Sequence, residues 1–259
     1  MTREAGERAN ALLAEKASLR RAAAKAGPQP SLAAALRGDD VSVIAEVKRS
    51  SPSKGAINPA IDVERQAAAY AAGGAGAISI LTEPRRFGGS NDDLIRARSR
   101  VTLPLLKKDF HVDVLQIFEA KTLGASAALV IVRAVDPKRL GELLQAGRDV
   151  DLEILVEIRN EAELDLALTL EAVLIGVNNR NLETLEIEPE TSLRLLPLIP
   201  RTVVAIAESG VKTPSDVERL GRAGADAVLV GTELSGSSNP EVAVRSLTGI
   251  ARTAGARKS

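Results

Sequence analysis

The chain has 259 residues, of which 45% are hydrophobic, and its 34 basic and 34 acidic residues give a formal net charge of +0. This composition excludes intrinsic disorder, and the balanced charge excludes a global basic field that would attract nucleic acid or an anionic membrane. With no Cys and a single His, the chain cannot form disulfides, a thiolate metal site, a cysteine nucleophile or a multi-histidine metal centre.

Residues 1–40 differ in pattern from the rest of the chain. They begin with a charged stretch of helical type that is unlike a signal peptide, so we expect a cytoplasmic protein. The pattern predicts a helix over Arg3–Lys25, a break at Gly27-Pro28 and a short turn of helix over Ser31–Leu36. We interpret residues 1–40 as an N-terminal helical extension. We expect residues 41–259 to form the main domain.

From residue 41 onward, short apolar runs alternate with amphipathic stretches, which is typical of βα units around a parallel sheet. None of the apolar runs reaches the ~18 residues of a membrane span. Strands are predicted at Val41–Arg49, Ala77–Thr82, Leu103–Phe110, Ala127–Val132, Leu152–Ile158, Val173–Asn178, Thr202–Ser209 and Ala227–Val230. Helices between them are predicted at Asp62–Ala72, Val114–Leu123, Asp136–Ala146, Glu161–Leu168 and Pro214–Gly221.

An internal repeat supports eight such units. The segments that begin at Gly74, Gly124 and Gly224 each end a helix and open a strand, and they lie 50 and 100 residues apart. Two βα units per step of 50 residues predict a single (β/α)8 TIM barrel of the α/β class. A doubly wound open sheet is the alternative, but it predicts no such regularity and usually carries a GxGxxG motif, which we do not find.

Charged and polar residues end five of the predicted strands, where barrel enzymes have their active sites. They are Glu46, Lys48, Lys108, Glu157, Asn178 and Glu208. Because strand side chains alternate, Glu46 and Lys48 point to one side, whereas Lys107 and Lys108 point to opposite sides. A structural layer of ion pairs would be a costly filling for the barrel, so we favour an acid/base pocket. In such a pocket we expect a crowded, desolvated Lys to have a lowered pKa and a buried Glu a raised one.

The loops after the last two strands combine glycine with a hydroxyl side chain, in Ser209-Gly210 and Gly231-Thr232. Barrels commonly bind a phosphate there through backbone N–H groups. Phe87 and Phe110 follow strand ends, where either could stack on a flat substrate or pack in the core. We expect Tyr70 to be a packing residue and His111, which has no nucleophile arranged around it, to be a surface or loop residue.

These motifs together resemble those of indole-3-glycerol phosphate synthases, in order, from about residue 41 to the end. The matching segments are Glu46-Val47-Lys48-Arg49-Ser50-Ser51-Pro52-Ser53, Lys108-Asp109-Phe110, Leu155-Val156-Glu157, Gly176-Val177-Asn178-Asn179-Arg180-Asn181-Leu182, Ala207-Glu208-Ser209-Gly210 and Val230-Gly231. The resemblance implies an enzyme of tryptophan biosynthesis that closes the indole ring of 1-(2-carboxyphenylamino)-1-deoxyribulose 5-phosphate and releases carbon dioxide and water. It implies no cofactor and no metal.

The resemblance also implies a role for each site residue. Lys108 is the general acid, Glu157 its acid/base partner, and Glu46 orients the lysines and assists the loss of water. Lys48 and Ser51 hold the substrate carboxylate. Asn178 and Glu208 hold the sugar hydroxyls and the intermediate, and Arg180, on the substrate-binding side, supports these two residues. The phosphate binds to Ser209, Gly210, Gly231 and Thr232, and the ring is bordered by Phe87 and Phe110. The family often has Ser at the position of Thr232, where the methyl group of Thr could alter phosphate packing.

Other interpretations remain open at this point. A Schiff-base phosphosugar aldolase would use Lys108 or Lys48 as a nucleophile, and a non-catalytic phosphosugar-binding barrel would need only the glycine loops. Phosphoribosylanthranilate isomerase is disfavoured, because that family employs a Cys. For partners we expect a small phosphosugar substrate, no nucleic acid and no membrane, and a monomer or weak homo-oligomer.

Overall fold

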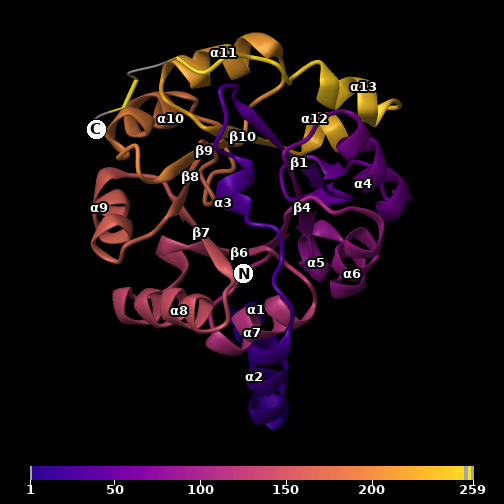
Figure 1. Cartoon of the computed structure of the whole chain (residues 1–259), viewed down its shortest axis with the longest axis vertical. Coiled ribbons are helices and arrows are strands. Elements are labelled where there is room, and N and C mark those ends of the chain that lie inside the picture. The colour runs from indigo at the N-terminus through magenta and orange to yellow at the C-terminus, as the bar shows by residue number, and fades with distance from the viewer. Residues whose placement is uncertain (1, 254–255, 258–259) are drawn as a thin grey trace.

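The computed structural model describes residues 2–253 and 256–257, and it contains a closed barrel of eight parallel strands in the order β1-β10-β9-β8-β7-β6-β5-β4 (Figure 1). The strands are β1 Ser42–Val47, β4 Ala77–Leu81, β5 Leu105–Lys108, β6 Ala127–Ile131, β7 Glu153–Ile158, β8 Leu174–Asn178, β9 Val204–Glu208 and β10 Ala227–Val230. Each lies within a predicted range, so the (β/α)8 barrel is confirmed and the open sheet is wrong. The two-residue strands β2 Ser50–Ser51 and β3 Gly55–Ala56 form a separate hairpin after β1.

Helices surround the barrel on its outer side (Figure 1). They are α4 Val63–Ala72, α5 Pro84–Phe87, α6 Asn91–Arg100, α7 Val114–Thr122, α8 Pro137–Asp149, α9 Glu161–Thr169, α10 Glu190–Leu195, α11 Pro214–Arg222, α12 Thr232–Ser235 and α13 Pro240–Arg245, with 3-10 turns η2 Val132–Ala134 and η3 Leu196–Leu198. All five predicted helices are present. Several begin where a side chain caps the first turn, as Asp62 does for α4 and Asn160 for α9.

Strand side chains alternate between two apolar layers, as a parallel barrel requires. The residues that point outward pack under the helices in one large cluster. The residues that point inward fill the barrel in a second cluster, which includes Ile44, Leu106 and Leu155. Leu32 and Leu36 belong to this inner cluster although they precede the barrel in sequence, and both are fully buried. Leu32 begins helix α3 Leu32–Ala35 and Leu36 directly follows it, and this helix lies over the centre of the barrel in Figure 1.

A carboxylate of the barrel holds α3 in place. Glu153, at the start of β7, accepts hydrogen bonds from Ser31 Oγ at 2.6 Å, from Leu32 N at 2.7 Å and from Ala33 N at 3.0 Å. Because Glu153 begins its strand, α3 lies at the amino-terminal end of the barrel and closes it. The opposite end, where the strands finish, remains open for a site.

The rest of the extension runs along the outside of the barrel. It consists of α1 Thr2–Ala11, the 3-10 turn η1 Leu13–Glu15 and α2 Lys16–Lys25, so the predicted helical segment Arg3–Lys25 is present and is divided by the turn. The two helices on either side of the turn contact different parts of the barrel. Arg8 of α1 contacts Glu83 and Asp109 beyond the strand ends, whereas α2 packs along α7.

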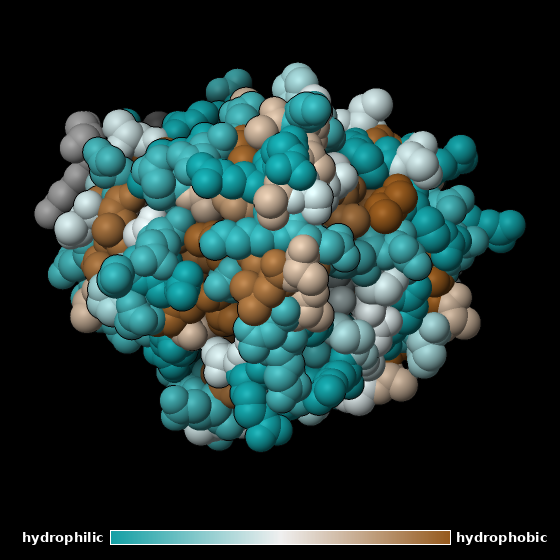
Figure 2. Space-filling model, turned by 90° about the horizontal axis from the view of Figure 1, so that it is seen from below, coloured by the Kyte–Doolittle hydropathy of each residue, from teal (hydrophilic) through white to brown (hydrophobic). Residues whose placement is uncertain are grey.

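None of the helices in residues 2–253 and 256–257 is long and apolar enough to cross a membrane. Figure 2, which shows the side toward which α2 projects in Figure 1, is mostly hydrophilic, with hydrophobic residues in separate groups. The exposed large hydrophobic residues belong to different elements of the fold and are Leu13, Ile95, Val173, Ile187, Leu198 and Val242.

Candidate active site

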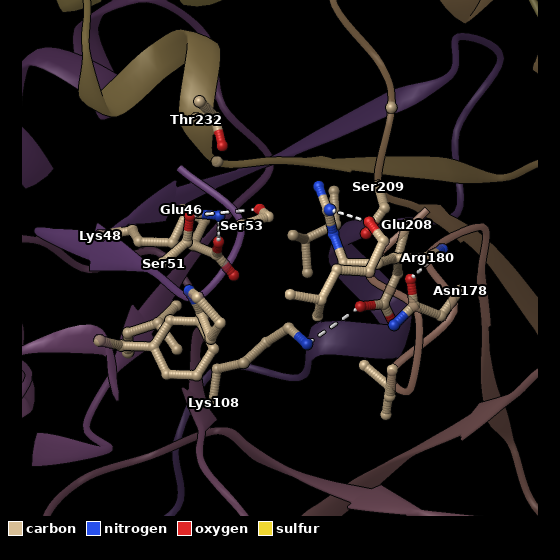
Figure 3. A pocket seen from close by; sticks show the side chains of 18 of the residues that line it. Glu46, Lys48, Ser51, Ser53, Lys108, Asn178, Arg180, Glu208, Ser209 and Thr232 are labelled. Atoms are coloured by element: carbon tan, nitrogen blue, oxygen red, sulfur yellow. Dashed lines mark hydrogen bonds and ion pairs between the residues drawn. The ribbon is translucent and has the colours of Figure 1, made fainter. Parts of the chain in front are cut away.

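A cavity of about 410 Å³ opens at the carboxyl ends of the strands. Every residue that the sequence analysis assigned to the site lines it, from Glu46 at the end of β1 to Thr232 after β10. Figure 3 shows Glu46, Lys48, Ser51 and Ser53 on one side of the cavity, Asn178, Arg180, Glu208 and Ser209 on the other, and Lys108 reaching between them. The charges therefore surround open space and do not fill it as a purely structural plug would.

The first strand supplies an ion pair to the cavity. Glu46 and Lys48 point to the same side, as their spacing predicts, and Lys48 Nζ lies 2.8 Å from Glu46 Oε1. Side chains of α4 and α12 hold the backbone of this segment, because the Glu46 carbonyl accepts hydrogen bonds from Tyr70 Oη at 3.1 Å and Ser235 Oγ at 2.7 Å. Tyr70 is fully buried, so its prediction as a packing residue is confirmed.

The centre of the cavity holds Lys108. Its Nζ lies 3.1 Å from Glu208 Oε2 and 3.4 Å from Glu157 Oε2. The neighbouring Lys107 points away from the cavity and pairs with Asp109 and Glu119, each at 3.5 Å. The alternation that selected Lys108 over Lys107 is thus borne out by the geometry.

The protonation of this cluster differs from the expectation at one residue. Burial acts to lower the pKa of Lys108, but the carboxylates of Glu208, Glu157 and Glu46 outweigh it and raise that pKa. The expected lowering of a lysine pKa was wrong here, because Lys108 has acidic neighbours and not a second lysine. Burial, opposed by Lys108 and reinforced by Glu157, raises the pKa of Glu208 to about 7. The expected rise for a buried Glu is therefore seen at Glu208, whose Oε1 has no hydrogen-bond partner among the described residues.

The end of β8 orients the second carboxylate. Asn178 Nδ2 donates to Glu157 Oε1 at 2.9 Å, so Glu157 is held between an amide and the Lys108 ammonium. Asn178 Oδ1 in turn accepts from the Arg180 backbone N–H at 2.9 Å. The Arg180 side chain donates to the Leu185 carbonyl at 2.7 Å and lines the cavity. Partial burial lowers the pKa of Arg180.

The two glycine loops bring unsatisfied backbone donors to the cavity. Ser209 and Gly210 both have positive φ, 68° and 88°. At Gly231 a Cβ atom would lie 2.3 Å from Glu46 Oε1 and 2.6 Å from Lys48 Nζ, so any larger residue would displace the ends of these two side chains. Within the described residues, no hydrogen bond engages the backbone N–H of Gly210 or Gly231. Free N–H groups beside glycines are the usual means of binding a phosphate.

The cavity is also lined by apolar side chains. Phe87 and Phe110 are half-buried and line it, and Phe110 also packs against the inner core cluster. The cavity lining also contains aliphatic residues that the sequence did not single out as site residues, which are Leu81, Leu129, Ile131, Leu182, Leu185 and Ile187. Alternation within β6 could have indicated Leu129 and Ile131, but the run Ala127–Val132 is apolar throughout and hides which residues face inward.

His111 is the residue whose environment was predicted wrongly. It lies in the loop after β5, as expected, but it is 1% exposed, so the surface interpretation was wrong. Its Nδ1 lies 2.6 Å from the Leu129 carbonyl, and burial, with Lys107 nearby, lowers the pKa of the imidazole to about 3. His111 is therefore neutral and fixes the loop that follows Lys108. The described residues contain no group of His, Asp and Glu suited to hold a metal ion.

A closed parallel barrel whose strand ends carry paired acids and bases around a cavity defines a (β/α)8-barrel enzyme. Comparison with known proteins identifies the particular family. Residues 3–247 match the family described as indole-3-glycerol phosphate synthase, and the chain belongs to it. The family's reaction is a decarboxylating ring closure in tryptophan biosynthesis, a lyase activity.

Individual relatives agree with this assignment. The chain is 48% identical over 229 residues to "Indole-3-glycerol phosphate synthase 1" of Streptomyces coelicolor, with 88% of this chain and 85% of the relative covered. It is 48% identical over 234 residues to a Nocardioides protein of the same family name, with 90% of both covered. A solved thiamine phosphate pyrophosphorylase from Pyrococcus furiosus has a TM-score of 0.60 at 13% identity, over 80% of this chain and 93% of its own, and shares the fold alone.

Proposed function

We propose that Lys108 and Glu157 carry out the acid/base chemistry of indole-3-glycerol phosphate synthesis in this chain. The observation that carries the proposal is the position of Lys108 Nζ in the cavity, within 3.4 Å of both Glu157 and Glu208. The reaction closes the ring of 1-(2-carboxyphenylamino)-1-deoxyribulose 5-phosphate. The ring carbon that bears the carboxylate forms a bond to the ketone carbon, and carbon dioxide leaves that ring carbon. The new hydroxyl then takes up a proton and leaves as water, while the neighbouring CH2 carbon, bonded to nitrogen, loses a proton to form the double bond of the indole.

Lys108 acts at the ketone. Its raised pKa keeps it protonated at neutral pH, so a positive charge meets the negative charge that develops on the ketone oxygen during attack. The proton then moves from Nζ to that oxygen, and the carboxylates beside the lysine stabilise the charge before the transfer. Glu157, held by Asn178 and Lys108, is the group that exchanges protons as water is lost.

Lys48 and Ser51 hold the substrate carboxylate until it leaves as carbon dioxide. The ion pair with Glu46, at 2.8 Å, fixes the Lys48 ammonium and limits its freedom before the substrate binds. Glu46 also assists the later loss of water. Phe87 and Phe110 border the aromatic ring, and aliphatic residues of the cavity lining contribute to the apolar slot that an arene needs.

The sugar and its phosphate occupy the opposite side. Asn178 and Glu208 hold the sugar hydroxyls and the intermediate, and Arg180 supports these two residues. The phosphate lies against Ser209, Gly210, Gly231 and Thr232, where the free N–H groups of the two glycines donate to it. Binding energy from this remote phosphate then orients the reacting atoms.

The first test is an assay of the purified chain with this substrate in buffer that contains EDTA, followed by the fluorescence of the indole product. We expect turnover without a metal or cofactor. Lys108→Ala lowers turnover at least about 100-fold, the usual contribution of a general acid, while a phosphate ligand still binds. Lys138→Ala, on the exposed face of α8, is the matched control and retains the wild-type rate.

Two outcomes would redirect the proposal. Unchanged turnover in Lys108→Ala removes this lysine from the mechanism, and a Glu157→Gln variant with the wild-type pH–rate profile removes Glu157. Substrate binding without product indicates a non-catalytic barrel. A covalent adduct trapped by borohydride indicates a Schiff-base aldolase instead.

We further propose that residues 1–40 are an extension, that residues 41–259 form the catalytic domain, and that the chain is a cytoplasmic monomer or weak homo-oligomer. The separation of the exposed hydrophobic residues over several elements supports a weak self-association at most. The net charge of +0 supports the absence of a nucleic-acid partner. The size-exclusion profile of the purified chain tests the oligomeric state.

A further inference from the structure

A partly buried ion pair lies next to the residues assigned to the substrate carboxylate and ring. Arg49 follows Lys48 but does not line the cavity, because consecutive side chains alternate. Its guanidinium binds Asp93 in a bidentate manner, with Nη1 2.6 Å from Oδ2 and Nη2 2.8 Å from Oδ1. The Asp93 side chain is 6% exposed and that of Arg49 is 22% exposed, so the pair is well shielded from water.

Arg49 also fixes the loop to which it belongs. Its carbonyl accepts hydrogen bonds from Ile57 N at 2.8 Å and Asn58 N at 3.1 Å, which closes the base of the loop after β1. Its neighbour Ser50 donates from Oγ to the Arg86 carbonyl at 3.0 Å. The residues of the loop between Arg49 and Ile57, which include Ser51, are therefore held at the base of the loop by Arg49.

The other partner of Arg49 is the segment after β4. Asp93 lies in the first turn of α6, and Arg49 Nη1 also donates to the Gly88 carbonyl at 3.2 Å. Gly88 has φ of 67°, and at Gly89 a Cβ atom would lie 2.0 Å from the Leu81 carbonyl oxygen. The chain is therefore tightly packed immediately after this contact. Phe87 immediately precedes it.

The pair thus joins two parts of the cavity that act on one rigid group of the substrate. Arg49 lies between Lys48 and Ser51, which the proposed function assigns to the carboxylate. Asp93 lies on the α5–α6 segment, which also contains Phe87, assigned to the ring. In the substrate, the carboxylate is bonded directly to that ring. The spacing between the two protein segments must therefore match one fixed distance in the substrate, and a planar, bidentate ion pair is a contact that sets such a distance.

We propose that Arg49 and Asp93 are positioning residues that set the spacing between the carboxylate-binding loop and the aromatic slot, and so make the site selective for an ortho-carboxylated aryl amine. This inference rests on the proposed function of Lys48, Ser51 and Phe87. Neither Arg49 nor Asp93 contacts the substrate, and both act through the segments that they join.

The test compares two ligands that differ only in the carboxylate. One is the substrate reduced to an alcohol at its ketone, and the other is the same molecule without the ring carboxylate. Calorimetry gives both dissociation constants for the wild type, Arg49→Lys and Asp93→Asn. Lys retains the charge but cannot form the bidentate contact, and Asn retains the shape but removes the charge. Asp93→Asn serves where Arg49→Lys fails to fold.

In the wild type we expect the carboxylated ligand to bind at least about tenfold more tightly, which corresponds to ~1.4 kcal/mol. In the variants this ratio falls toward one, while the affinity for the ligand without the carboxylate changes less than about twofold. The kcat/KM of the variants falls about 10- to 100-fold, since a misplacement of ~1 Å can cost 100-fold. Arg133→Lys, in the Arg133–Glu163 pair between η2 and α9, is the matched control and changes neither quantity.

A ratio that stays at the wild-type value in both variants overturns the inference, and so does an equal loss of affinity for both ligands, which indicates a general structural role. Failure of the proposed function gives a different result. In that case the wild type itself shows no turnover and no preference for the carboxylated ligand.

Discussion

Substitution of Glu208 by Gln makes the folded protein more stable at neutral pH, although it removes a residue of the site. Glu208 is 2% exposed, and its pKa in the folded chain is raised from 4.5 to about 7 by burial, against the opposing effect of Lys108. In the unfolded chain the carboxyl returns to its ordinary pKa. Folding therefore binds a proton at pH values between these two, and the ionised carboxylate disfavours the folded state.

The magnitude follows from the difference between the two pKa values. A shift of about 2.5 units corresponds to ~3 kcal/mol, because each pKa unit is 1.36 kcal/mol. The group has a raised pKa and carries a negative charge when deprotonated, so the free energy of unfolding decreases as the pH rises from about 4.5 to about 7 and is level above that. Gln has no charge to bury, so Glu208→Gln does not lose stability over this range.

Urea unfolding of the wild type and Glu208→Gln at pH 5, 6, 7 and 8 measures this effect. We expect the variant to gain about 1 kcal/mol at pH 5 and about 3 kcal/mol at pH 8, while its kcat falls. Glu218→Gln, on the exposed surface of α11, is the control and keeps a constant difference from the wild type. A constant difference for Glu208→Gln as well would refute the reasoning, because Glu208 would then ionise equally in both states.

Two further substitutions separate the two ends of the barrel. Gly231→Ala inserts a methyl group within 2.6 Å of both Glu46 Oε1 and Lys48 Nζ, so we expect kcat/KM to fall at least about tenfold, with a smaller change in Tm. Gly141→Ala is the control, because a Cβ atom there would lie 3.7 Å from its nearest neighbour. Wild-type kinetics for Gly231→Ala would contradict the crowding at Gly231. Glu153→Ala removes three hydrogen bonds to the segment that starts α3 and lowers the free energy of unfolding by ~2 kcal/mol in urea titrations, with kcat unchanged in native buffer. A loss of kcat equal to that of Gly231→Ala would show that the two ends are not independent.

The positions of the strands and of the charged strand ends could be read from the sequence for simple physical reasons. A parallel strand buried on both faces must be apolar along its length, so a charge at its end, such as Glu157, marks the place where the strand leaves the core. The period of 2 along a strand then separated Lys108 from Lys107 without knowledge of the fold. Gly231 could be noted as a turn residue. The side chains that a Cβ atom at this position would meet belong to Glu46 and Lys48, almost two hundred positions earlier in the sequence.

Other features depend on contacts that sequence order does not reveal. The raised pKa of Lys108 arises from carboxylates on β7 and β9, which only the closed barrel brings within 3.4 Å. His111 is buried because its ring donates to a carbonyl of the neighbouring strand, and a polar residue in a loop gives no local sign of such an acceptor. The partnership of Arg49 with Asp93 is equally non-local, since nothing in either segment specifies the other.

The N-terminal extension reaches from one end of the barrel to the other, and this path ties two local unfolding events together. Arg8 of α1 binds Asp109, the residue after Lys108, whereas α3 covers the opposite end with Leu32 and Leu36. A partial opening that detaches residues 2–36 would expose the inner apolar cluster and release the support next to Lys108 in one step. Amide hydrogen exchange in α1, α3 and the loop after β5 would then report a single cooperative unit, and heat inactivation would precede the melting of the barrel.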